Sequence, residues 1–313
     1  MAIEKYNFQR FSAARIFIIT FLVSGYLALS WLLIGFKPDQ LILASLFCFL
    51  YFGNHLTRKL ILGFSIFIIY WIIFDYMKTF PNYKFNTVHI EDLYYWEKNS
   101  FGIKSGSLLL TPNEFWNLHS GKLLDLLSGF FNLCWVPVPL TFAAYLFFKN
   151  KQQFLNFSLT FFLINLLGFV VYYSFPAAPP WYFQKFGSSF YPLTPGNPAG
   201  LARFDLILNT KIFESIYSKS SNVFAAMPSL HASYPLLVLY YGLRNKMGLL
   251  NIFFAVITVG IWFTAVYTGH HYVLDVLAGI LCCIFGTFLF NWIIKMSVPR
   301  RLIGGYYKII GGI

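Results

Sequence analysis

The sequence predicts an all-α protein, a polytopic bundle of about six to eight transmembrane helices. Two observations predict this class. Of the 313 residues, 58% are hydrophobic and only 11% are charged, whereas a soluble domain carries about 25% charged residues. The apolar residues also gather in long runs, and a helix needs about 20 such residues to cross roughly 30 Å of hydrocarbon. We therefore expect one helical bundle with two sizeable loops, 78–122 and 177–228.

The predicted spans follow the chain in order. The first run follows a basic N-terminus, is long enough to span and ends without a small-residue cleavage site, so a retained helix is expected. The second and sixth runs are short, and one of the first three could be re-entrant or interfacial. The predicted runs are 14–36, 41–56, 60–77, 123–148, 154–176, 229–243, 249–268 and 271–296.

Basic residues indicate the orientation of these spans. Lys and Arg concentrate in the N-terminus, the even-numbered connections and the tail, whereas the connection before His271 has none. Since cytoplasmic connections carry the excess of Lys and Arg, both termini are predicted to be cytoplasmic and the His271 end to face the other side. The net charge of +12 fits anchors facing anionic lipid, and no soluble basic domain suits nucleic acid. The absence of long polar tails favours a bacterial inner membrane with a periplasmic site over a Golgi membrane with a lumenal one.

The first candidate site lies in the stretch 267–275. His271 and Asp275 are four residues apart, so on a helix they lie on one face, one turn from each other. A carboxylate there can accept the imidazole proton and fix the tautomer. His270 points off that face, so His271 is the better partner. Ionisable residues leading a membrane-length segment indicate function; the alternative is a structural buried ion pair.

The second candidate stretch is Met-Pro-Ser-Leu-His at 227–231. Pro228 suits the first turn of a helix, whose free N–H groups, with the Ser229 hydroxyl, can form an anion cradle. His231 lies at the same end, on the membrane face of His271. The two stretches together predict a phosphate site. The alternatives are a simple cap for Ser229 and a polar helix end for His231.

The third stretch, 175–182, contains prolines that end a helix and two aromatic residues, Trp181 and Tyr182, that suit the membrane interface. The loop that follows is too long for a plain connector, so a lid or headgroup role is expected. The cation that neutralises a phosphate has several candidates. These are His270, Lys185, Arg203, Lys211 and Lys219.

The remaining polar residues are interpreted as structural. Loop 78–122, with Glu91, Asp92 and Glu97, is most simply a solvated cap. For His119 and Asp125 an ordinary helix-start role is favoured over lining the cavity. The candidate site has one carboxylate and no zinc or magnesium ligand spacing, so neither a metal nor a cofactor is expected.

Two motifs resemble those of a known family. Met-Pro-Ser-Leu-His at 227–231 and His-Tyr-Val-Leu-Asp at 271–275 resemble the second and third motifs of the type-2 phosphatidic acid phosphatase superfamily. The Ala-Pro-Pro-Trp run, Leu230 in place of Gly and the Thr-Gly-His-His-Tyr form are most similar to its inositol phosphorylceramide synthase-like branch, the aureobasidin-target type. The superfamily's first motif, a Lys and an Arg-Pro, has no match, and its Ser-Arg falls on Thr264-Ala265.

The resemblance implies a domain organisation and a set of roles. It implies a catalytic core like that of the superfamily at 123–296, preceded by transmembrane helices and a cap loop at 1–122 and followed by a basic cytoplasmic tail at 297–313. His271 is implied as a nucleophile that forms a phospho-histidine, Asp275 as its orienting partner and His231 as general acid and then base. The substrate-binding candidates are Ser229, His270, Trp181, Tyr182, Lys185 and Arg203.

The function implied by the resemblance is metal-independent transfer of inositol phosphate from phosphatidylinositol to a ceramide-type hydroxyl. A lipid phosphatase, with water as the acceptor, is the first alternative, and the low-charge site counts against it. A non-catalytic transporter or scaffold for anionic lipid is the second. The residues alone support phosphoryl transfer on a lipid. They do not fix the headgroup, the acyl chains or the oligomeric state.

Overall fold

The computed structural model describes residues 12–219 and 222–311, and it confirms the predicted helical class. One two-stranded hairpin, β1 Ile103–Ser105 with β2 Leu108–Leu110, lies within the described residues. The helices are α1 Ala13–Ile34, α2 Pro38–Gly53, α3 His55–Tyr76, α4 Glu91–Phe101, α5 Pro112–Leu118, α6 Lys122–Leu133, α7 Pro137–Lys149, α8 Lys151–Ser174, α9 Pro180–Phe186, α10 Ala202–Leu208, α11 Ile212–Tyr217, α12 Leu230–Arg244, α13 Leu250–Tyr267, α14 Val273–Ile293 and α15 Ser297–Ile309.

The multi-pass membrane prediction is confirmed by helix length and composition. In the described part of the chain, six helical segments are long and apolar enough to cross a membrane. Helix α2, of 16 residues, is a shorter apolar helix, and α12 has 15 residues. These are the two spans that the sequence predicts to be short. The six are Ala13–Ile34, His55–Tyr76, Lys122–Lys149, Lys151–Ser174, Leu250–Tyr267 and Val273–Ile293.

The chain divides into two compact units, Met1–Thr79 with Leu302–Ile313, and Phe80–Arg301. In the first unit, α1 exposes large apolar side chains such as Phe17 at 72% and Leu32 at 77%. Such surface suits lipid contact. The Ser30 hydroxyl contacts the Tyr76 hydroxyl at 2.8 Å, so a polar pair links α1 to α3.

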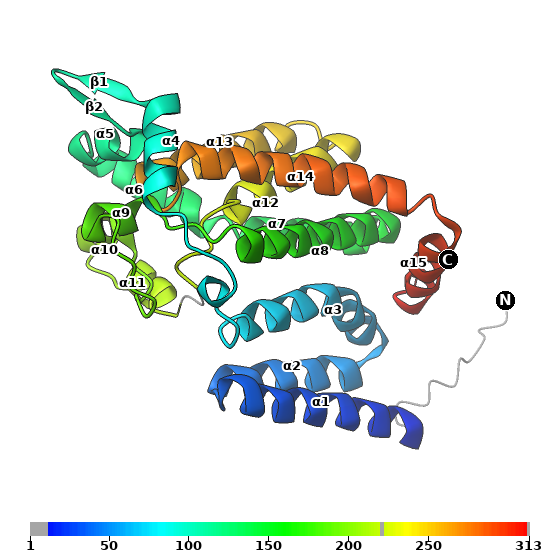
Figure 1. Cartoon of the computed structure of the whole chain (residues 1–313). Helices are drawn as coiled ribbons and strands as arrows, with labels where there is room; N and C mark the ends of the chain where they lie inside the picture. Colours follow the sequence, from blue (N-terminus) through cyan, green and yellow to red (C-terminus); the bar gives the residue numbers. More distant parts are fainter. Residues whose placement is uncertain (1–11, 220–221, 312–313) are drawn as a thin grey trace. The chain divides into compact units, whose positions relative to one another are not determined.

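The second unit holds the helical core and the two long loops. Helix α12 packs against α7, α8, α13 and α14, and Figure 1 shows these helices lengthwise beside one another. Helices α8 and α13 end, and α12 and α14 begin, at the same end of this bundle. The connections 175–229 and 268–272 therefore meet there, together with α4, α5 and the short helices α9 to α11.

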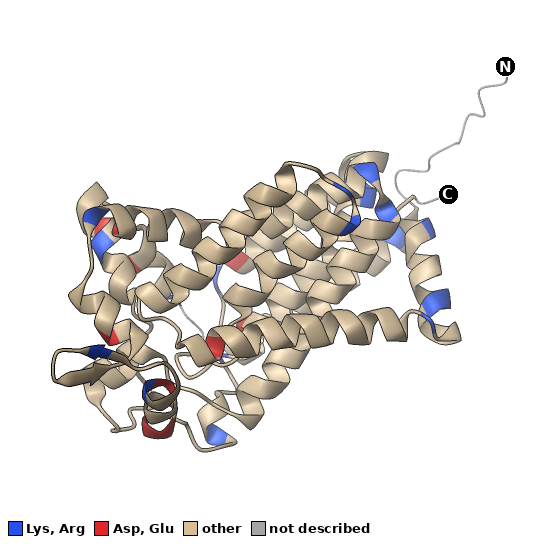
Figure 2. Ribbon diagram, turned by 90° about the horizontal axis from the view of Figure 1, so that it is seen from above, with Lys and Arg blue, Asp and Glu red and all other residues tan. Residues whose placement is uncertain are grey.

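Charge distinguishes the two ends of this bundle. Lys149, Lys151, Arg244 and Lys246 lie where α7 and α12 end and α8 begins, and the Lys and Arg residues stand there without acidic neighbours (Figure 2). The acidic residues of this unit all belong to the opposite end. They are Glu91, Asp92, Glu97, Glu114, Asp125, Asp205, Glu214 and Asp275.

The loop 78–122 is ordered rather than a plain solvated cap. It contains α4, the hairpin and α5. The Glu97 side chain is fully buried, so the solvated interpretation is wrong for this residue. The physical reason is that α4 packs against α14 and turns Glu97 towards the free N–H groups at the start of that helix.

Candidate active site

Three chain segments pair through their backbones beside the candidate site. The N–H of Ala177 donates to the Phe224 carbonyl at 2.9 Å, and the N–H of Ala226 donates to the Ala177 carbonyl at 3.2 Å. On the other side, Ala178 donates to the His89 carbonyl at 2.9 Å. The flanking prolines restrict the dihedral angles of the central segment. The Pro-Ala-Ala-Pro run therefore fixes the position of the Ala226 backbone.

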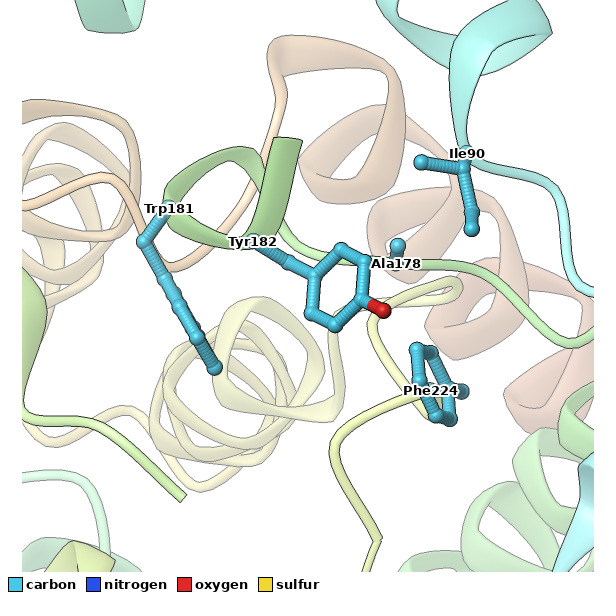
Figure 3. Packing of buried hydrophobic residues seen from close by; sticks show 5 residues of the cluster. All are labelled: Ile90, Ala178, Trp181, Tyr182 and Phe224. Carbon is cyan, nitrogen blue, oxygen red and sulfur yellow. The ribbon is translucent and has the colours of Figure 1, made fainter. Parts of the chain in front are cut away.

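An apolar cluster supports this pairing. Figure 3 shows the Tyr182 ring between Trp181 and Phe224, with Ala178 and Ile90 nearby. The Tyr182 ring centroid is 5.1 Å from that of Phe224 and 5.9 Å from that of Trp181. The Tyr182 hydroxyl donates to the Ser189 carbonyl at 3.0 Å and accepts from the Tyr191 N–H at 2.7 Å. Tyr182 therefore has a packing role and no hydrogen left to donate to a substrate.

His271 lies in the connection between α13 and α14, not on α14. This corrects the expectation that His271 and Asp275 share one helical turn. The reason is local: Gly269 has φ +74°, and Tyr272 is an extended N-cap at φ −72° and ψ 161°. The N–H groups of His270 and His271 both donate to the Ala265 carbonyl, at 3.1 and 3.0 Å. The turn is thus tied back to α13.

The surroundings of His271 fix its tautomer. Its Nδ1 lies 2.9 Å from the Ala226 carbonyl oxygen. A carbonyl oxygen only accepts, so Nδ1 carries the hydrogen and Nε2 of the neutral ring carries the lone pair. Burial lowers the pKa of His271 to about 4, against the opposing effect of the Ala226 bond. At neutral pH the ring is therefore uncharged, with a lone pair at Nε2.

Asp275 lies close to His271 without replacing the Ala226 carbonyl as its partner. The Asp275 Oδ2 is 3.6 Å from Nδ1 of His271, beyond normal hydrogen-bond length. The same oxygen accepts the Tyr272 N–H at 2.8 Å and so caps α14. The Asp275 Oδ1 is buried and has no hydrogen-bond partner among the described residues. The carboxyl group thus lies beside the ring and caps α14 at the same time.

His231 meets His271 at the start of α12. Its Nδ1 lies 3.3 Å from Nε2 of His271, and the ring centroids are 5.4 Å apart. The Trp135 ring packs on His231 at a centroid distance of 4.3 Å. Trp135 lies in the break between α6 and α7, and no motif in the sequence marks it as a site residue. The two imidazoles open to the same end of the bundle and are in direct contact.

Ser229 connects the two motifs. Its N–H donates to the Asp275 carbonyl at 2.9 Å, and a Cβ on Gly279 would lie 2.2 Å from the Ser229 carbonyl oxygen. Ser229, and not Pro228, is the N-cap of α12, so Pro228 precedes the helix rather than occupying its first turn. The buried Ser229 hydroxyl makes no cap bond and has no partner among the described residues. It is therefore available to a ligand.

Glu97 holds the start of α14 from the loop side. Its two carboxylate oxygens accept the N–H groups of Val273 at 2.9 Å and Leu274 at 3.1 Å. Burial raises the pKa of Glu97 to about 7, and nearby Asp275 adds to the rise while the two N–H donors oppose it. In the sequence Glu97 resembles a surface acid because Lys98, Asn99 and Ser100 follow it, and no motif marks it as a site residue.

Of the other predicted site residues, His270, Trp181 and Arg203 are buried or half-buried, whereas the lysines lie on the surface. The His270 ring contacts Thr268 Oγ1 at 3.0 Å and the Asn197 carbonyl at 3.3 Å, and it packs against Tyr217. Trp181 and Arg203 both line a cavity of about 150 Å³. The candidate lysines, by contrast, are exposed. They are Lys185, Lys211 and Lys219.

The polar atoms of the site suit a phosphate group better than a metal ion. In residues 12–219 and 222–311, no group of three His, Cys, Asp or Glu side chains lies close enough to hold a metal. The available groups are two imidazoles, a hydroxyl and a carboxylate next to two helix N-termini. Hydroxyl and N–H donors with imidazole nitrogens are the groups that bind and transfer a phosphoryl group.

Comparisons with known proteins agree with this chemistry. Residues 106–289 match the PAP2 superfamily. The chain is 42% identical over 290 residues to the phosphoinositol dihydroceramide synthase of Bacteroides thetaiotaomicron, covering 91% of this chain and 94% of that protein. No solved structure matches the chain.

Fungal relatives match over shorter lengths. The inositol phosphorylceramide synthase of Candida albicans is 30% identical over 161 residues, which are 47% of this chain and 33% of that protein. The inositol phosphorylceramide synthase catalytic subunit of Saccharomyces cerevisiae is 36% identical over 118 residues, 37% of this chain and 29% of that protein. The chain thus spans about a third of each fungal protein.

Fold, site and similarity together define a multi-pass membrane protein built for lipid phosphate chemistry. The chain belongs to the PAP2 superfamily. The resemblance expected from the two histidine motifs is confirmed.

Proposed function

We propose that this protein is an inositol phosphorylceramide synthase, which transfers inositol phosphate from phosphatidylinositol to a ceramide-type hydroxyl and releases diacylglycerol. The relative from Bacteroides thetaiotaomicron, of which this chain covers 94%, is named a phosphoinositol dihydroceramide synthase. The structural observation that carries the proposal is the 3.3 Å contact between Nε2 of His271 and Nδ1 of His231. This contact supports the roles of His271 as nucleophile and His231 as acid/base at one phosphorus.

In the first step, Nε2 of His271 attacks the phosphorus of phosphatidylinositol. The N–P bond forms, the P–O bond to diacylglycerol breaks, and the departing oxygen takes a proton from protonated His231, which becomes neutral. The phosphorylated ring retains its Nδ1 hydrogen and is positively charged. The Ala226 carbonyl at 2.9 Å and the Asp275 carboxylate at 3.6 Å stabilise that charge.

In the second step, the acceptor hydroxyl attacks the phosphorus and gives its proton to His231. The new P–O bond forms, the N–P bond breaks and His271 returns to its neutral form. The Ser229 hydroxyl, which lacks a partner among the described residues, donates to a non-bridging phosphate oxygen in both steps. The rings of His231 and His271 are in contact, so they must separate for the phosphate to enter between them.

Burial of the site favours a lipid acceptor over water. His271 is 7% exposed and Asp275 is fully buried, and restricted access limits hydrolysis of a phospho-enzyme. The superfamily's phosphatase-type Lys and Arg residues also have no match in the sequence. These features support transfer rather than the phosphatase alternative.

The distribution of basic residues supports a location for the reaction. At the end of the bundle opposite to the site, the short connections carry Lys and Arg without acidic residues (Figure 2), and short connections of this kind face the cytoplasm. We therefore place the site on the non-cytoplasmic side, which is the periplasmic side of an inner membrane in a bacterium.

The test is a reconstitution. Purified protein in liposomes receives labelled phosphatidylinositol with and without ceramide, and the lipid products are separated. Inositol phosphorylceramide that forms only with both substrates supports the proposal, whereas released inositol phosphate supports hydrolysis. Recovery of a phosphorylated residue at position 271 after rapid acid-free quenching tests the intermediate. His119→Ala is the matched control, because His119 is exposed and its Nδ1 contacts the Phe115 carbonyl.

A further inference from the structure

We infer that the cavity lined by Trp181, Gln184, Arg203 and two asparagines is the subsite for the polyol headgroup of the donor lipid. This inference rests on the proposed function and deepens it. The cavity, of about 150 Å³, is formed by α5, α9, the segment 199–203 and the turn 267–269. His271 follows that turn by two residues.

Arg203 supplies a cation, and one of its three guanidinium nitrogens has no partner among the described residues. Its Nε donates to Asp125 Oδ1 at 2.6 Å, and its NH1 lies 3.4 Å from Asn117 Oδ1. The guanidinium stacks over the Tyr267 ring, 5.1 Å from the centroid, and the Tyr267 hydroxyl also donates to Asp125 at 2.8 Å. The buried NH2 has no partner among the described residues. The ion pair therefore orients Arg203 and leaves one donor for a ligand.

Asn113 supplies an unused acceptor in the same cavity. Its Nδ2 donates to the carbonyls of Val266 and His271 at 2.7 and 2.9 Å. Its Oδ1 is buried and has no partner among the described residues, and the residue as a whole is 1% exposed. A buried acceptor without a donor destabilises the fold. A ligand hydroxyl that donates to this oxygen removes that penalty and so favours binding.

The cavity and the reaction centre share one turn of the chain. Asn113 binds the backbone carbonyl of His271. The Trp181 N–H donates to the Gly269 carbonyl at 3.0 Å, and the Gly200 N–H donates to the Thr268 carbonyl at 2.8 Å. Both lining segments are thus bonded to the turn that carries the nucleophile. A headgroup in the cavity is therefore held next to the phosphate that His271 attacks.

The lining chemistry fits a ring that carries many hydroxyl groups and a phosphate. Amides of Asn117 and Gln184 at the exposed rim can donate and accept, as each hydroxyl requires. The faces of Trp181 and Tyr267 offer apolar contact to the C–H side of such a ring. A guanidinium prefers an anionic oxygen. Inositol phosphate combines all three features, whereas a glycerol or ethanolamine headgroup offers fewer hydroxyls for the two unused groups.

The experiment compares substrate kinetics in two lining variants. Arg203→Lys retains a charge for Asp125 and removes the free NH2, and Gln184→Ala removes a rim amide on the exposed side of α9. We expect the KM for phosphatidylinositol to rise about tenfold in Arg203→Lys and a few-fold in Gln184→Ala. We expect kcat and the KM for ceramide to stay within about twofold. Inhibition by myo-inositol 1-phosphate weakens in parallel, while inhibition by glycerol 1-phosphate is weak throughout.

The matched control is Gln152→Ala, because Gln152 is an exposed glutamine at the opposite end of α8. An unchanged donor KM in both lining variants overturns the inference while the proposed function stands. The inference is also overturned if both variants show a lower kcat, altered KM values for both substrates and a lower melting temperature together. If wild-type protein forms no inositol phosphorylceramide, the melting temperature with myo-inositol 1-phosphate decides. Stabilisation of wild type but not of the variants supports the subsite, and no stabilisation of wild type overturns it.

Discussion

The turn 268–272 carries two adjacent histidines in different surroundings. His270 contacts Thr268, Asn197 and Tyr217, whereas His271 lies between the Ala226 carbonyl and a second imidazole. Burial lowers the pKa of both rings, to about 3 for His270 and about 4 for His271. Burial and titration therefore do not distinguish them. The difference lies in what each Nε2 faces, a backbone carbonyl for His270 and His231 for His271.

The strongest test of this comparison is to remove the His271 ring. His271→Ala leaves no nucleophile, so we expect kcat to fall by roughly a thousandfold or more. The measurement is the rate of inositol phosphorylceramide formation in liposomes, with thermal melting as a check on folding. A variant that folds and turns over at the wild-type rate contradicts the assignment of His271.

Removal of His231 tests the partner ring. We expect His231→Ala to lower kcat by about 100- to 10,000-fold, the usual range for loss of an acid/base group. Phospho-enzyme formation can be followed separately with a donor whose leaving group is more acidic. Since such a leaving group needs no proton, it restores the first step if His231 acts as the acid. Failure of that donor to rescue the first step contradicts the role.

Asp275→Asn tests the charge beside His271. The amide oxygen can still accept the Tyr272 N–H that Oδ2 accepts now, while the negative charge near the phosphorylated ring is lost. We expect kcat to fall by about 10- to 100-fold at a nearly unchanged melting temperature, as about 1.4 kcal/mol corresponds to each tenfold loss. Equal losses in kcat and in stability would show that the carboxylate acts only as a helix cap.

Glu97 gives a smaller effect, with a defined pH dependence. Its pKa is raised from 4.5 to about 7 in the folded protein. Between these values the folded state holds a proton that the unfolded state has lost, so stability falls as pH rises from about 4.5 to 7 and is level above that. The loss is at most about 3 kcal/mol. We expect Glu97→Gln to flatten this part of the melting-temperature profile, and an unchanged slope contradicts the buried placement.

The smallest expected effect is at His270. His270→Gln retains a polar side chain beside Thr268 and Asn197, so we expect kcat to fall by less than about fivefold. The rate is measured beside that of His271→Ala under the same conditions. A loss equal to that of His271→Ala would contradict the assignment of His271 as the nucleophile and His270 as a structural residue.

The sequence predicts the helices well and the site only in part. The spans follow from apolar runs, because a membrane-crossing helix must satisfy its backbone internally and keep its apolar side chains outside. The motifs identify His231 and His271, which the structure brings into contact. The turn containing His271 is not predicted, since its helix start depends on Glu97 and Asp275 accepting the first N–H groups.

Other groups near His271 leave no usable signal in the sequence. The Ala226 group that fixes its tautomer is a backbone carbonyl, and any residue type would provide it. Trp135 is one aromatic residue in a chain that is 21% aromatic. Glu97 looks like a surface acid until α4 is packed against α14. These roles depend on contacts between segments far apart in the chain.

Because Gly279 has no side chain, the backbone of α14 can approach the Ser229 backbone at the start of α12. A side chain there would collide with the Ser229 carbonyl at 2.2 Å, while the Ser233 hydroxyl donates to the Gly279 carbonyl at 2.7 Å. Helices α12 and α14 are therefore in backbone contact at Ser229 and Gly279, close to His231 and Asp275. The neighbouring cavity shares the turn 267–269 with His271, but its other lining residues belong to α5, α9 and the segment 199–203. On our proposal for the cavity, exchange of α5, α9 or the segment 199–203 changes the headgroup preference and leaves the contact between α12 and α14 intact.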